Sequence, residues 1–579
     1  MRGVSAPAKP QLRVAYTAWL SILVSAFGGC SFGSEQTITP QNVCASDGDC
    51  VQGVCDQGIC IDDSSSEVSI AVQVLRGSAD TQGATPASWT FAPESFSRAS
   101  ERDYTLPPIR QVVGVVRWQG TPVPATLRFT RRMGESISAV PVEVDTSSGD
   151  GGGDDPGDVD YSTVLVVGQS YDVAVLPTND VIQTADQTAA AIRSLPPMYT
   201  SVELDDVVDG AFRFDVRFPD ALDVECAENQ LFGCTLTGTV LSFDGQNATP
   251  AVGLQVRAVE KESGRVVSSI GETSQLGDFA IRVSDEAALY ALRVTSGVGG
   301  DPFPSVSVDL DLAFINDPAR RRIYVPRVDS VQSTGAVRDG EGRGVQGATV
   351  RFSSSGIFEQ SELGLVTTFS ASTTTNDDGS FSLELLPGLY TVIVTPPEDA
   401  ENTWAPVAEE ALVAEDLTEL EDIVLPSQIA LSGSCTTFTG DPAGGVAVVA
   451  QARGELGELQ RSRLTASNQE GVFRLTVDPG RYDMLIKVAD ATGFPWLIEP
   501  ELVMSEERGA MTRDYTLPTP IVVRGTLQAA GGMIVGGAPI RAYVFETSGG
   551  EVRPIQVAET ISAEDGSYRL LISPTLDGR

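Results

Sequence analysis

The sequence predicts an all-β protein in which tandem β-sandwiches follow a small cysteine-rich module. Three observations predict this fold class. Short signatures recur about every 95 residues, apolar and polar residues alternate near them, and the 579 residues include 57 glycines and 34 prolines. Abundant turn residues are typical of chains with many short strands. The length corresponds to four or five domains of ordinary size.

The first 29 residues have the features of an export signal. They carry three basic residues and no acidic residue, and an apolar run from Val14 to Gly29 is shorter than a membrane-spanning helix. The run ends in small residues directly before Cys30. This arrangement resembles the bacterial lipobox, and the resemblance implies that Cys30 is diacylated and becomes the mature N-terminus. An ordinary secretory signal is the alternative.

Composition excludes several classes of function. The chain has no histidine, so it contains no Ser-His-Asp or Cys-His catalytic system and no His-ligated zinc or haem. Its 78 acidic and 39 basic residues give a net charge of −39, which becomes −42 without residues 1–29. Such a charge repels nucleic acid and anionic membranes. We expect no nucleic-acid partner, no cofactor and no metal, and membrane contact only through the lipid anchor.

Four cysteines lie close together, at Cys44, Cys50, Cys55 and Cys60. This polar segment is too short to bury a core, so two disulfides would hold it together in an oxidising compartment. The spacing lacks the paired Cys-x2-Cys of a zinc site and allows three disulfide pairings. The pattern resembles small cysteine-rich modules that follow the lipid anchor in secreted bacterial proteins, including those of myxobacteria.

Three further cysteines lie in the body of the chain. Seven residues separate Cys226 from Cys234, which favours a local disulfide worth about 2–3 kcal/mol. Cys435 falls in an expected strand. We expect its side chain to be a small buried apolar group rather than a reactive thiol.

Internal repeats predict the fold of residues 108–579. A glycine opens each unit, with spacings of 97, 98 and 92 residues between Gly238, Gly335, Gly433 and Gly525, and Gly114 opens a more divergent unit. About 40 residues after each similar start, a tight turn precedes an aromatic residue, at Phe279, Phe381, Phe473 and Tyr568. A third signature, Pro-Gly-x-Tyr, ends at Tyr390 and Tyr482, and a weaker version ends at Tyr171.

Each signature has a mechanical interpretation. Glycine adopts positive φ in a tight turn at little cost. The residues after the turn alternate with period two, so Phe381, Leu383 and Leu385 share one face of a strand. Pro-Gly then turns the chain into a second alternating run at residues 389–394. Two such strands, each with one apolar face, make half of a sandwich.

The three signatures resemble those of carboxypeptidase regulatory-like domains, which are transthyretin-like, Ig-like β-sandwiches of seven strands sometimes grouped with carbohydrate-binding-like folds. The resemblance covers about residues 108–579 and implies a fold rather than an activity. It concerns an accessory domain, because the zinc site of the peptidase needs histidines that are absent here. Collagen-adhesin B-type domains are also similar. The units at 331–427 and 520–579 contain no lysine, so they cannot form the isopeptide bond of those domains.

These signatures divide the chain into eight parts. They are a lipoprotein signal (1–29), a cysteine-rich stem (30–66), a half-unit (67–107), four β-sandwiches (108–225, 226–330, 331–427, 428–519) and an incomplete sandwich (520–579). Residues 102–107 and 513–518 have the same sequence, Arg-Asp-Tyr-Thr-Leu-Pro. We favour two independent pieces, a separately folded 67–107 and an incomplete C-terminus. In the alternative, one half-unit completes the other, within a chain or head to tail.

Two local features are candidate ligand sites. The aspartate-rich stretch 147–160 could hold Ca²⁺, but its glycines favour a solvated hairpin insertion. Trp118 stands beside a turn and could stack on a sugar ring. A packing role within its own hairpin is the preferred interpretation. Trp89, Trp404 and Trp496 recur at matching places in the units, so we expect them to pack.

The sequence therefore predicts a non-catalytic cell-envelope lipoprotein with no catalytic residues. Ser31 after Cys30 lacks the acidic residue that retains lipoproteins in the inner membrane, which favours the outer membrane, facing the periplasm or the cell surface. Proline-ended junctions suggest a rod for structural display or protein–protein adhesion. The alternatives are a carbohydrate-binding surface protein and the accessory arm of an enzyme. The partner, a protein or a glycan, and the oligomeric state stay open.

Overall fold

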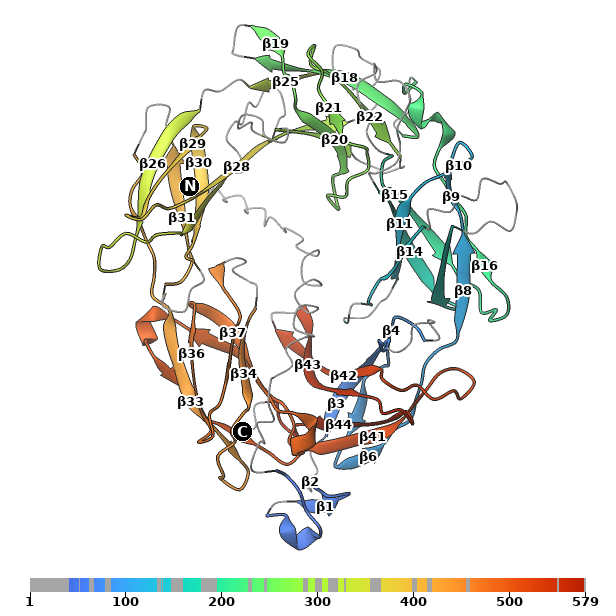
Figure 1. The fold of residues 1–579 in the computed structure, drawn as a ribbon, viewed down its shortest axis with the longest axis vertical. Coiled ribbons are helices and arrows are strands. Elements are labelled where there is room, and N and C mark those ends of the chain that lie inside the picture. Colours follow the sequence, from blue (N-terminus) through green and yellow to red (C-terminus); the bar gives the residue numbers. More distant parts are fainter. Residues whose placement is uncertain are drawn as a thin grey trace, which may run out of the picture.

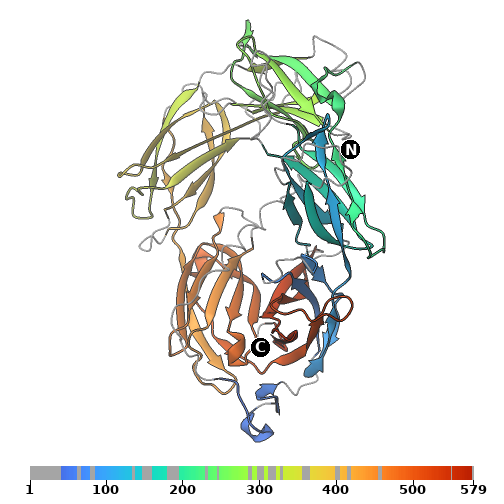
Figure 2. The ribbon, with the colours of Figure 1, turned by 45° about the vertical axis from the view of Figure 1, so that its right-hand side comes forward.

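The computed structural model contains five β-sandwiches that follow one another around a ring (Figures 1 and 2). It describes residues 41–51, 53–61, 67–78, 85–132, 137, 139–146, 160–178, 195–227, 232–243, 247–284, 290–296, 305–310, 321–326, 330–354, 366–397, 404–413, 419–453, 459–548 and 551–576. Helices in these ranges are short 3-10 turns: η2 (Asp47–Asp49), η3 (Asp220–Asp223), η5 (Asp490–Thr492) and η6 (Glu506–Arg508). The predicted all-β, tandem-sandwich fold class is confirmed.

Sandwich 1 spans residues 108–225 and sandwich 2 spans residues 226–330. Sandwich 1 contains β8 (Ile109–Gly114), β9 (Val116–Trp118), β10 (Thr121–Pro122), β11 (Ala125–Arg131), β12 (Val142–Asp145), β13 (Tyr161–Val166), β14 (Ser170–Pro177), β15 (Met198–Glu203), β16 (Phe212–Arg213) and β17 (Val216–Arg217). Sandwich 2 contains β18 (Cys234–Phe243), β19 (Ala248–Pro250), β20 (Gln255–Glu260), β21 (Gly271–Glu272), β22 (Asp278–Val283), β23 (Tyr290–Thr295), β24 (Ser305–Leu310) and β25 (Arg322–Pro326).

Sandwich 3 spans residues 331–427 and sandwich 4 spans residues 428–519. Sandwich 3 contains β26 (Val331–Arg338), β27 (Thr349–Ser354), β28 (Val366–Thr374), β29 (Ser380–Leu385), β30 (Gly388–Thr395), β31 (Val407–Val413) and β32 (Ile423–Val424). Sandwich 4 contains β33 (Ile429–Thr437), β34 (Ala447–Ala452), β35 (Arg463–Ala466), β36 (Val472–Val477), β37 (Gly480–Lys487), β38 (Leu497–Met504), β39 (Met511–Thr512) and β40 (Tyr515–Leu517).

Every sandwich follows one plan. An outer sheet is centred on the first strand of the unit, as in β36-β33-β39, and an inner sheet has four strands, as in β35-β34-β37-β38, or five in sandwich 5. Figure 1 places β34 and β37 toward the middle of the ring and β33 and β36 on its outside. Alternating side chains of the two sheets form one apolar core per sandwich.

The opening glycine and the later aromatic residue of each unit are directly opposite one another on adjacent strands. This antiparallel pair recurs in all five sandwiches, as Gly114–Tyr161, Gly238–Phe279, Gly335–Phe381, Gly433–Phe473 and Gly525–Tyr568. The aromatic ring covers the surface that glycine leaves bare. Two signatures that lie about 40 residues apart in the sequence are therefore the two halves of one cross-strand contact.

The tyrosine of the third signature closes a corner of the core in sandwiches 3 and 4. Tyr390 and Tyr482 are buried, and their hydroxyls donate to the carbonyl oxygens of Leu386 (2.7 Å) and Asp478 (3.0 Å), four residues upstream. Such a bond ties the turn to the following strand. The predicted turn before the aromatic is also present, because Gly379 has a φ of 80°.

Sandwich 5 is assembled from both ends of the described chain. Its C-terminal part contributes β41 (Ile521–Gln528), β42 (Pro539–Ser548), β43 (Glu551–Ile561) and β44 (Ser567–Ile572). Residues 67–107, the closure segment, contribute β3 (Val68–Leu75), β4 (Ser88–Thr90), β5 (Glu94–Phe96), β6 (Ala99–Glu101) and β7 (Tyr104–Thr105). β3 pairs antiparallel with β42, while β6 and β7 pair parallel with β41.

The favoured interpretation of two independent pieces is therefore wrong. The closure segment supplies the strands that the half-unit 520–579 lacks, because β3 takes the place of β37 and β7 takes the place of β40. Ile70, Val72 and Tyr104 are buried in the core of sandwich 5. The alternative of complementation within one chain is confirmed.

The expected rod is also wrong. The closure segment leads directly into sandwich 1, so its insertion into sandwich 5 joins the two ends of the row of sandwiches (Figure 1). Successive junctions turn the chain in one sense until it closes (Figure 2).

The close approach of the closure segment to Gly525 gives a direct test. A Cβ at Gly525 would lie 1.9 Å from the carbonyl oxygen of Arg102, which is backbone and cannot move aside. We expect Gly525→Ala to destabilise sandwich 5 by about 3 kcal/mol. Native-state hydrogen exchange should show faster exchange in β3, β6 and β41, with sandwiches 1 to 3 unaffected.

Gly340→Ala is the matched control, because a Cβ there meets no atom within 4 Å. It should leave hydrogen exchange unchanged. Equal protection of β3 in both variants would contradict the pairing of the closure segment with sandwich 5.

Candidate functional site

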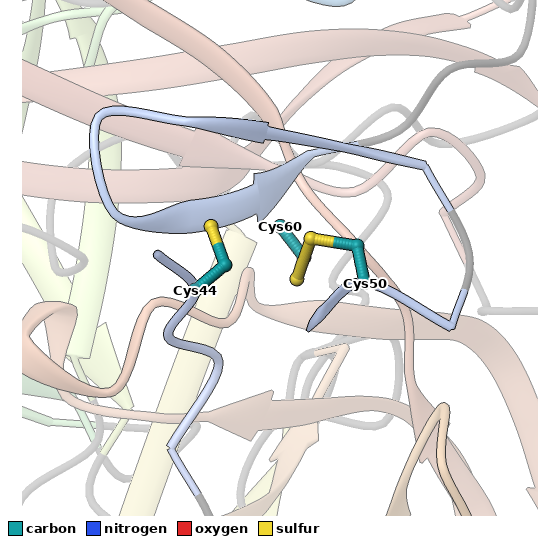
Figure 3. Close-up of side chains that lie close together, drawn as sticks. All are labelled: Cys44, Cys50 and Cys60. Atoms are coloured by element: carbon teal, nitrogen blue, oxygen red, sulfur yellow. A yellow bond between two sulfur atoms is a disulfide. The ribbon is translucent and has the colours of Figure 1, made fainter. Parts of the chain in front are cut away.

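Residues 41–61, the cysteine module, are a hairpin held by two disulfides. β1 (Val54–Asp56) pairs with β2 (Ile59–Ile61) around a turn at Gln57 and Gly58. Cys44 is bonded to Cys55, and Cys50 to Cys60. Figure 3 shows the Cys50–Cys60 bond with the sulfur of Cys44 beside it. The sulfurs of Cys44, Cys50 and Cys60 lie within 4.8 Å of one another, but all are in disulfides, so none is a thiolate for a metal.

The cysteine module docks on the ring where sandwiches 4 and 5 meet. Buried Asn42 donates from its side chain to the carbonyl oxygens of Gly493 (2.9 Å) and Cys60 (2.8 Å). Asp56 forms an ion pair with Arg524 of β41. These contacts fix the module to both sandwiches.

An apolar patch on the outer face of sandwich 5 receives the cysteine module. Ile59 and Ile61 cover the cross-strand pair Val522 and Leu571. The same positions of sandwich 4 hold Ala430 and Thr476, which face solvent. Sandwich 5 therefore differs from its neighbour in sequence just where the module covers it.

The other cysteines behave as the sequence predicts. Cys226 and Cys234 form a disulfide at the start of β18. Cys435 is free and fully buried in the core of sandwich 4. Burial, with a smaller contribution from the nearby Asp514 carboxylate, raises the pKa of its thiol to about 12, so the unreactive thiol is the stable form.

Tryptophan and arginine side chains join sandwich 1 to its two neighbours. The Arg131 guanidinium lies 4.3 Å from the ring centre of Trp89, which belongs to sandwich 5. The Arg282 guanidinium of sandwich 2 lies 4.8 Å from the ring centre of Trp118. Trp118 also donates to the carbonyl oxygen of Pro219 at 3.1 Å. Cation–π contacts of this kind are strongest where water is excluded.

Trp118 is thus part of a junction between sandwiches. Arg282, which covers its ring, is itself only 4 % exposed, and the indole N–H is already bonded within sandwich 1. Trp118 therefore packs, as expected, but against sandwich 2 as well as within sandwich 1. Stacking of a sugar on Trp118 stays a prediction that this geometry does not favour.

Two different devices join sandwich 3 to its neighbours. β24 of sandwich 2 pairs with β28 of sandwich 3, which fuses the two inner sheets into one of eight strands. On the other side, Arg461 of sandwich 4 binds the buried Asp478 carboxylate (2.7 Å) and donates to the carbonyl oxygen of Trp404 (2.9 Å) in sandwich 3.

A buried ion cluster joins sandwiches 4 and 5. Arg453 and Asp483 are 5 % and 2 % exposed, and the Arg453 guanidinium also contacts Glu501 and Glu546. Asp483 receives a second ion pair from Arg553 of sandwich 5. A β-bulge between Tyr482 and Met484 turns Asp483 into this position. The sequence gives no sign of the cluster, because Arg453 follows β34 and the other four members lie on four separate strands.

Several predicted features lie outside the described residues. Cys30 and most of the aspartate-rich stretch 147–160 are among them. Asp160, at the end of that stretch, accepts a hydrogen bond from the backbone of Val116 and lies 3.7 Å from Arg117, so it serves the hairpin of sandwich 1. In the part of the chain that the structure covers, no helix is long and apolar enough to cross a membrane.

Several buried tyrosines in the described chain have a pKa that is shifted by burial. Burial raises the pKa of Tyr104, Tyr515 and Tyr568 far above its usual range. Their hydroxyls stay protonated and serve as hydrogen-bond donors. Tyr568 donates to the carbonyl oxygen of Arg102 and Tyr515 to Glu499 (2.9 Å). These groups therefore have structural roles at the closing strands.

No protein-family model matches the chain, and no curated protein matches it. Several solved structures do. A minor pilin of Streptococcus agalactiae is 14% identical over 33% of this chain and 96% of its own, with a TM-score of 0.22. The TIE protein of Bacillus anthracis is 10% identical over 79% and 76%, with a TM-score of 0.16.

The major pilin subunit of Bacillus cereus is 11% identical over 49% of this chain and 99% of its own, with a TM-score of 0.15. All three TM-scores are well below 0.5, and all three identities are low. These likenesses therefore carry no conclusion about the activity or partners of this chain.

The buried cluster predicts a local stability change. Arg453→Leu leaves Asp483 with one remaining cationic partner, so we expect the 4–5 junction to open more easily by about 3 kcal/mol. Native-state hydrogen exchange of β37, β38 and β43 measures this opening. Arg132→Leu is the control, because its partner Asp172 is solvent-exposed. That change should have little effect, and equal effects of the two variants would contradict a stabilising role for the cluster.

The pKa of Cys435 predicts its reactivity. In a Cys30→Ser form, Cys435 is the one cysteine outside a disulfide in the described chain. We expect no reaction with Ellman's reagent in native buffer at mildly alkaline pH, and one equivalent in concentrated guanidinium. Rapid labelling of the folded protein would show that the core of sandwich 4 opens readily.

Proposed function

We propose that the chain is an exported, non-catalytic lipoprotein of the outer membrane that presents a rigid ring of β-sandwiches for protein–protein contact. The observation that carries this proposal is that tryptophans and buried charged residues, which often form ligand or catalytic sites, serve here to join one sandwich to the next. Trp89 and Trp118 stack on arginines of a neighbouring sandwich, and Trp496 lies beside residues of sandwich 5. Trp404 accepts a hydrogen bond from Arg461 of sandwich 4 through its backbone carbonyl oxygen. Arg453 contacts Glu546 of sandwich 5. The buried Asp478 carboxylate holds Arg461, which donates to sandwich 3.

Three properties support export and display. The disulfides fit an oxidising compartment outside the inner membrane. The strongly negative charge keeps the ring soluble and away from anionic headgroups. Lipid attached at Cys30 would lie only eleven residues before the first described residue of the docked cysteine module. The membrane would therefore hold the ring near the junction of sandwiches 4 and 5.

This attachment leaves the opposite side of the ring for a partner. Figure 1 places sandwich 2 across the ring from the cysteine module. Acidic side chains outnumber basic ones two to one in the chain, so a protein partner with a basic surface fits best.

The anchor gives the first test. Cys30→Ala should abolish labelling by radioactive palmitate and move the protein from the membrane fraction to the soluble fraction. Cys435→Ala is the control and should keep both label and membrane attachment. Absence of label in the unaltered protein would contradict the anchor. Protease treatment of intact cells then reports whether the ring faces outward.

The contact role is tested with the purified ring on protein and glycan arrays. Binding to proteins that falls with rising salt supports the proposal. Binding to glycans that is lost in Trp118→Ala would replace it by the carbohydrate-binding alternative.

A further inference from the structure

The ring closes at a seam where the closure segment, the donor, inserts into the C-terminal strands of sandwich 5, the acceptor. In the described residues, this seam contains no covalent bond between donor and acceptor. Arg102 and Tyr568, which share a hydrogen bond, are 466 residues apart in the sequence. The closure segment joins its host strands by hydrogen bonds of β3 to β42 and of β6 and β7 to β41. On its other side, Pro107 and Pro108 connect it directly to β8 of sandwich 1. The donor therefore belongs to one end of the row of sandwiches and the acceptor to the other.

Sandwich 5 binds the closure segment through the motif Arg-Asp-Tyr-Thr-Leu-Pro. These contacts do not require that the motif follow directly in the same stretch of chain. In sandwich 4, Asp514 accepts from the backbone N–H (2.9 Å) and hydroxyl (2.7 Å) of Ser434. In sandwich 5, Asp103 accepts from the same two groups of Thr526, both at 2.7 Å. Residues 102–107 and 513–518 thus make the same contacts, although one arrives from within its sandwich and the other from the far end of the chain.

The glycine that lies against this motif has the same close contact in both sandwiches. A Cβ at Gly433 would lie 1.6 Å from the carbonyl oxygen of Arg513, and one at Gly525 would lie 1.9 Å from that of Arg102. The aromatic partners match too, because Tyr515 packs on Phe473 and Tyr104 on Tyr568. Nothing in these contacts distinguishes a donor of the same chain from that of another copy.

We propose that the closure segment of one chain also occupies sandwich 5 of a second copy, so that reciprocal exchange of residues 67–107 yields a dimer. The closed and exchanged forms contain the same seam contacts. They differ only in the entropy of chain connection and in strain at the Pro107–Pro108 hinge. Short hinges favour exchange between chains. High concentration favours the dimer, and dilution favours the closed ring.

Cysteine pairs at directly opposed positions report the exchange. Gln73 of β3 lies opposite Arg541 of β42. Chains with Gln73→Cys and chains with Arg541→Cys, both also Cys30→Ser and Cys435→Ala, are mixed, unfolded at mildly acidic pH to keep native disulfides from exchanging, refolded together and oxidised. Only a strand of one chain in the other can join the two cysteines.

Arg128→Cys and Ala174→Cys are the control pair, because these residues are opposed on β11 and β14 within the continuous sandwich 1. We expect cross-linked heterodimer from the seam pair to increase with refolding concentration and to exceed that of the control pair at least tenfold. The double variant Gln73→Cys/Arg541→Cys in one chain should give an intrachain cross-link on dilute refolding, which shows that both substitutions permit closure.

Light scattering of the chain with its native Gln73 and Arg541, refolded over the same concentrations, is an independent measurement. Dimer in that sample supports exchange. Only monomer in light scattering, together with seam cross-linking no greater than in the control pair, would overturn the inference. The proposal does not depend on the lipid anchor or on the adhesion role, because all of these samples are in solution and lack a partner.

Discussion

The structure depends on a backbone that crosses over a glycine of the outer sheet in four of the five sandwiches. In sandwiches 1, 2, 4 and 5, a carbonyl oxygen next to the last strand lies between 1.6 and 2.7 Å from where a Cβ would be at Gly114, Gly238, Gly433 and Gly525. In sandwiches 1, 4 and 5 that strand is broken into two short pieces parallel to the first strand. Because the crossing is held by hydrogen bonds and close packing, its strand need not come from the same stretch of chain. In sandwich 5 the crossing strand comes from the closure segment near the N-terminus, and this insertion closes the ring.

Closure gives every sandwich two neighbours, and different chemistry serves each junction. Backbone pairing joins β24 to β28, cation–π contacts flank sandwich 1, and buried carboxylates bind arginines at Asp478 and Asp483. Arginine suits these positions because its planar guanidinium both stacks on rings and binds carboxylates. In a chain with only three lysines, arginine supplies the cations at these junctions.

The sequence predicted the sandwiches because their signatures are local or regularly spaced. The glycine at 433 and the aromatic at 473 mark one cross-strand pair, and their repetition reveals the unit. The identity of residues 102–107 with 513–518 pointed to complementation but did not decide it, since two separate pieces would have the same sequence. Likewise, four cysteines allowed three pairings. The cluster around Arg453 left no signal, because its members come together only through the bulge at Asp483 and the docking of sandwich 5.

The seam also sets the order in which the molecule forms. Sandwiches 1 to 4 are continuous in sequence, so each forms from contacts within about 100 residues, whereas sandwich 5 needs residues 67–107 and 521–572 together. The cysteine module follows the same rule, because its apolar residues Ile59 and Ile61 are covered only by Val522 and Leu571. Synthesis begins at the N-terminus, so the closure segment waits with Ile70, Val72 and Tyr104 uncovered until the last strands arrive. Closure of the ring is therefore the final step, and docking of the cysteine module on sandwich 5 depends on it.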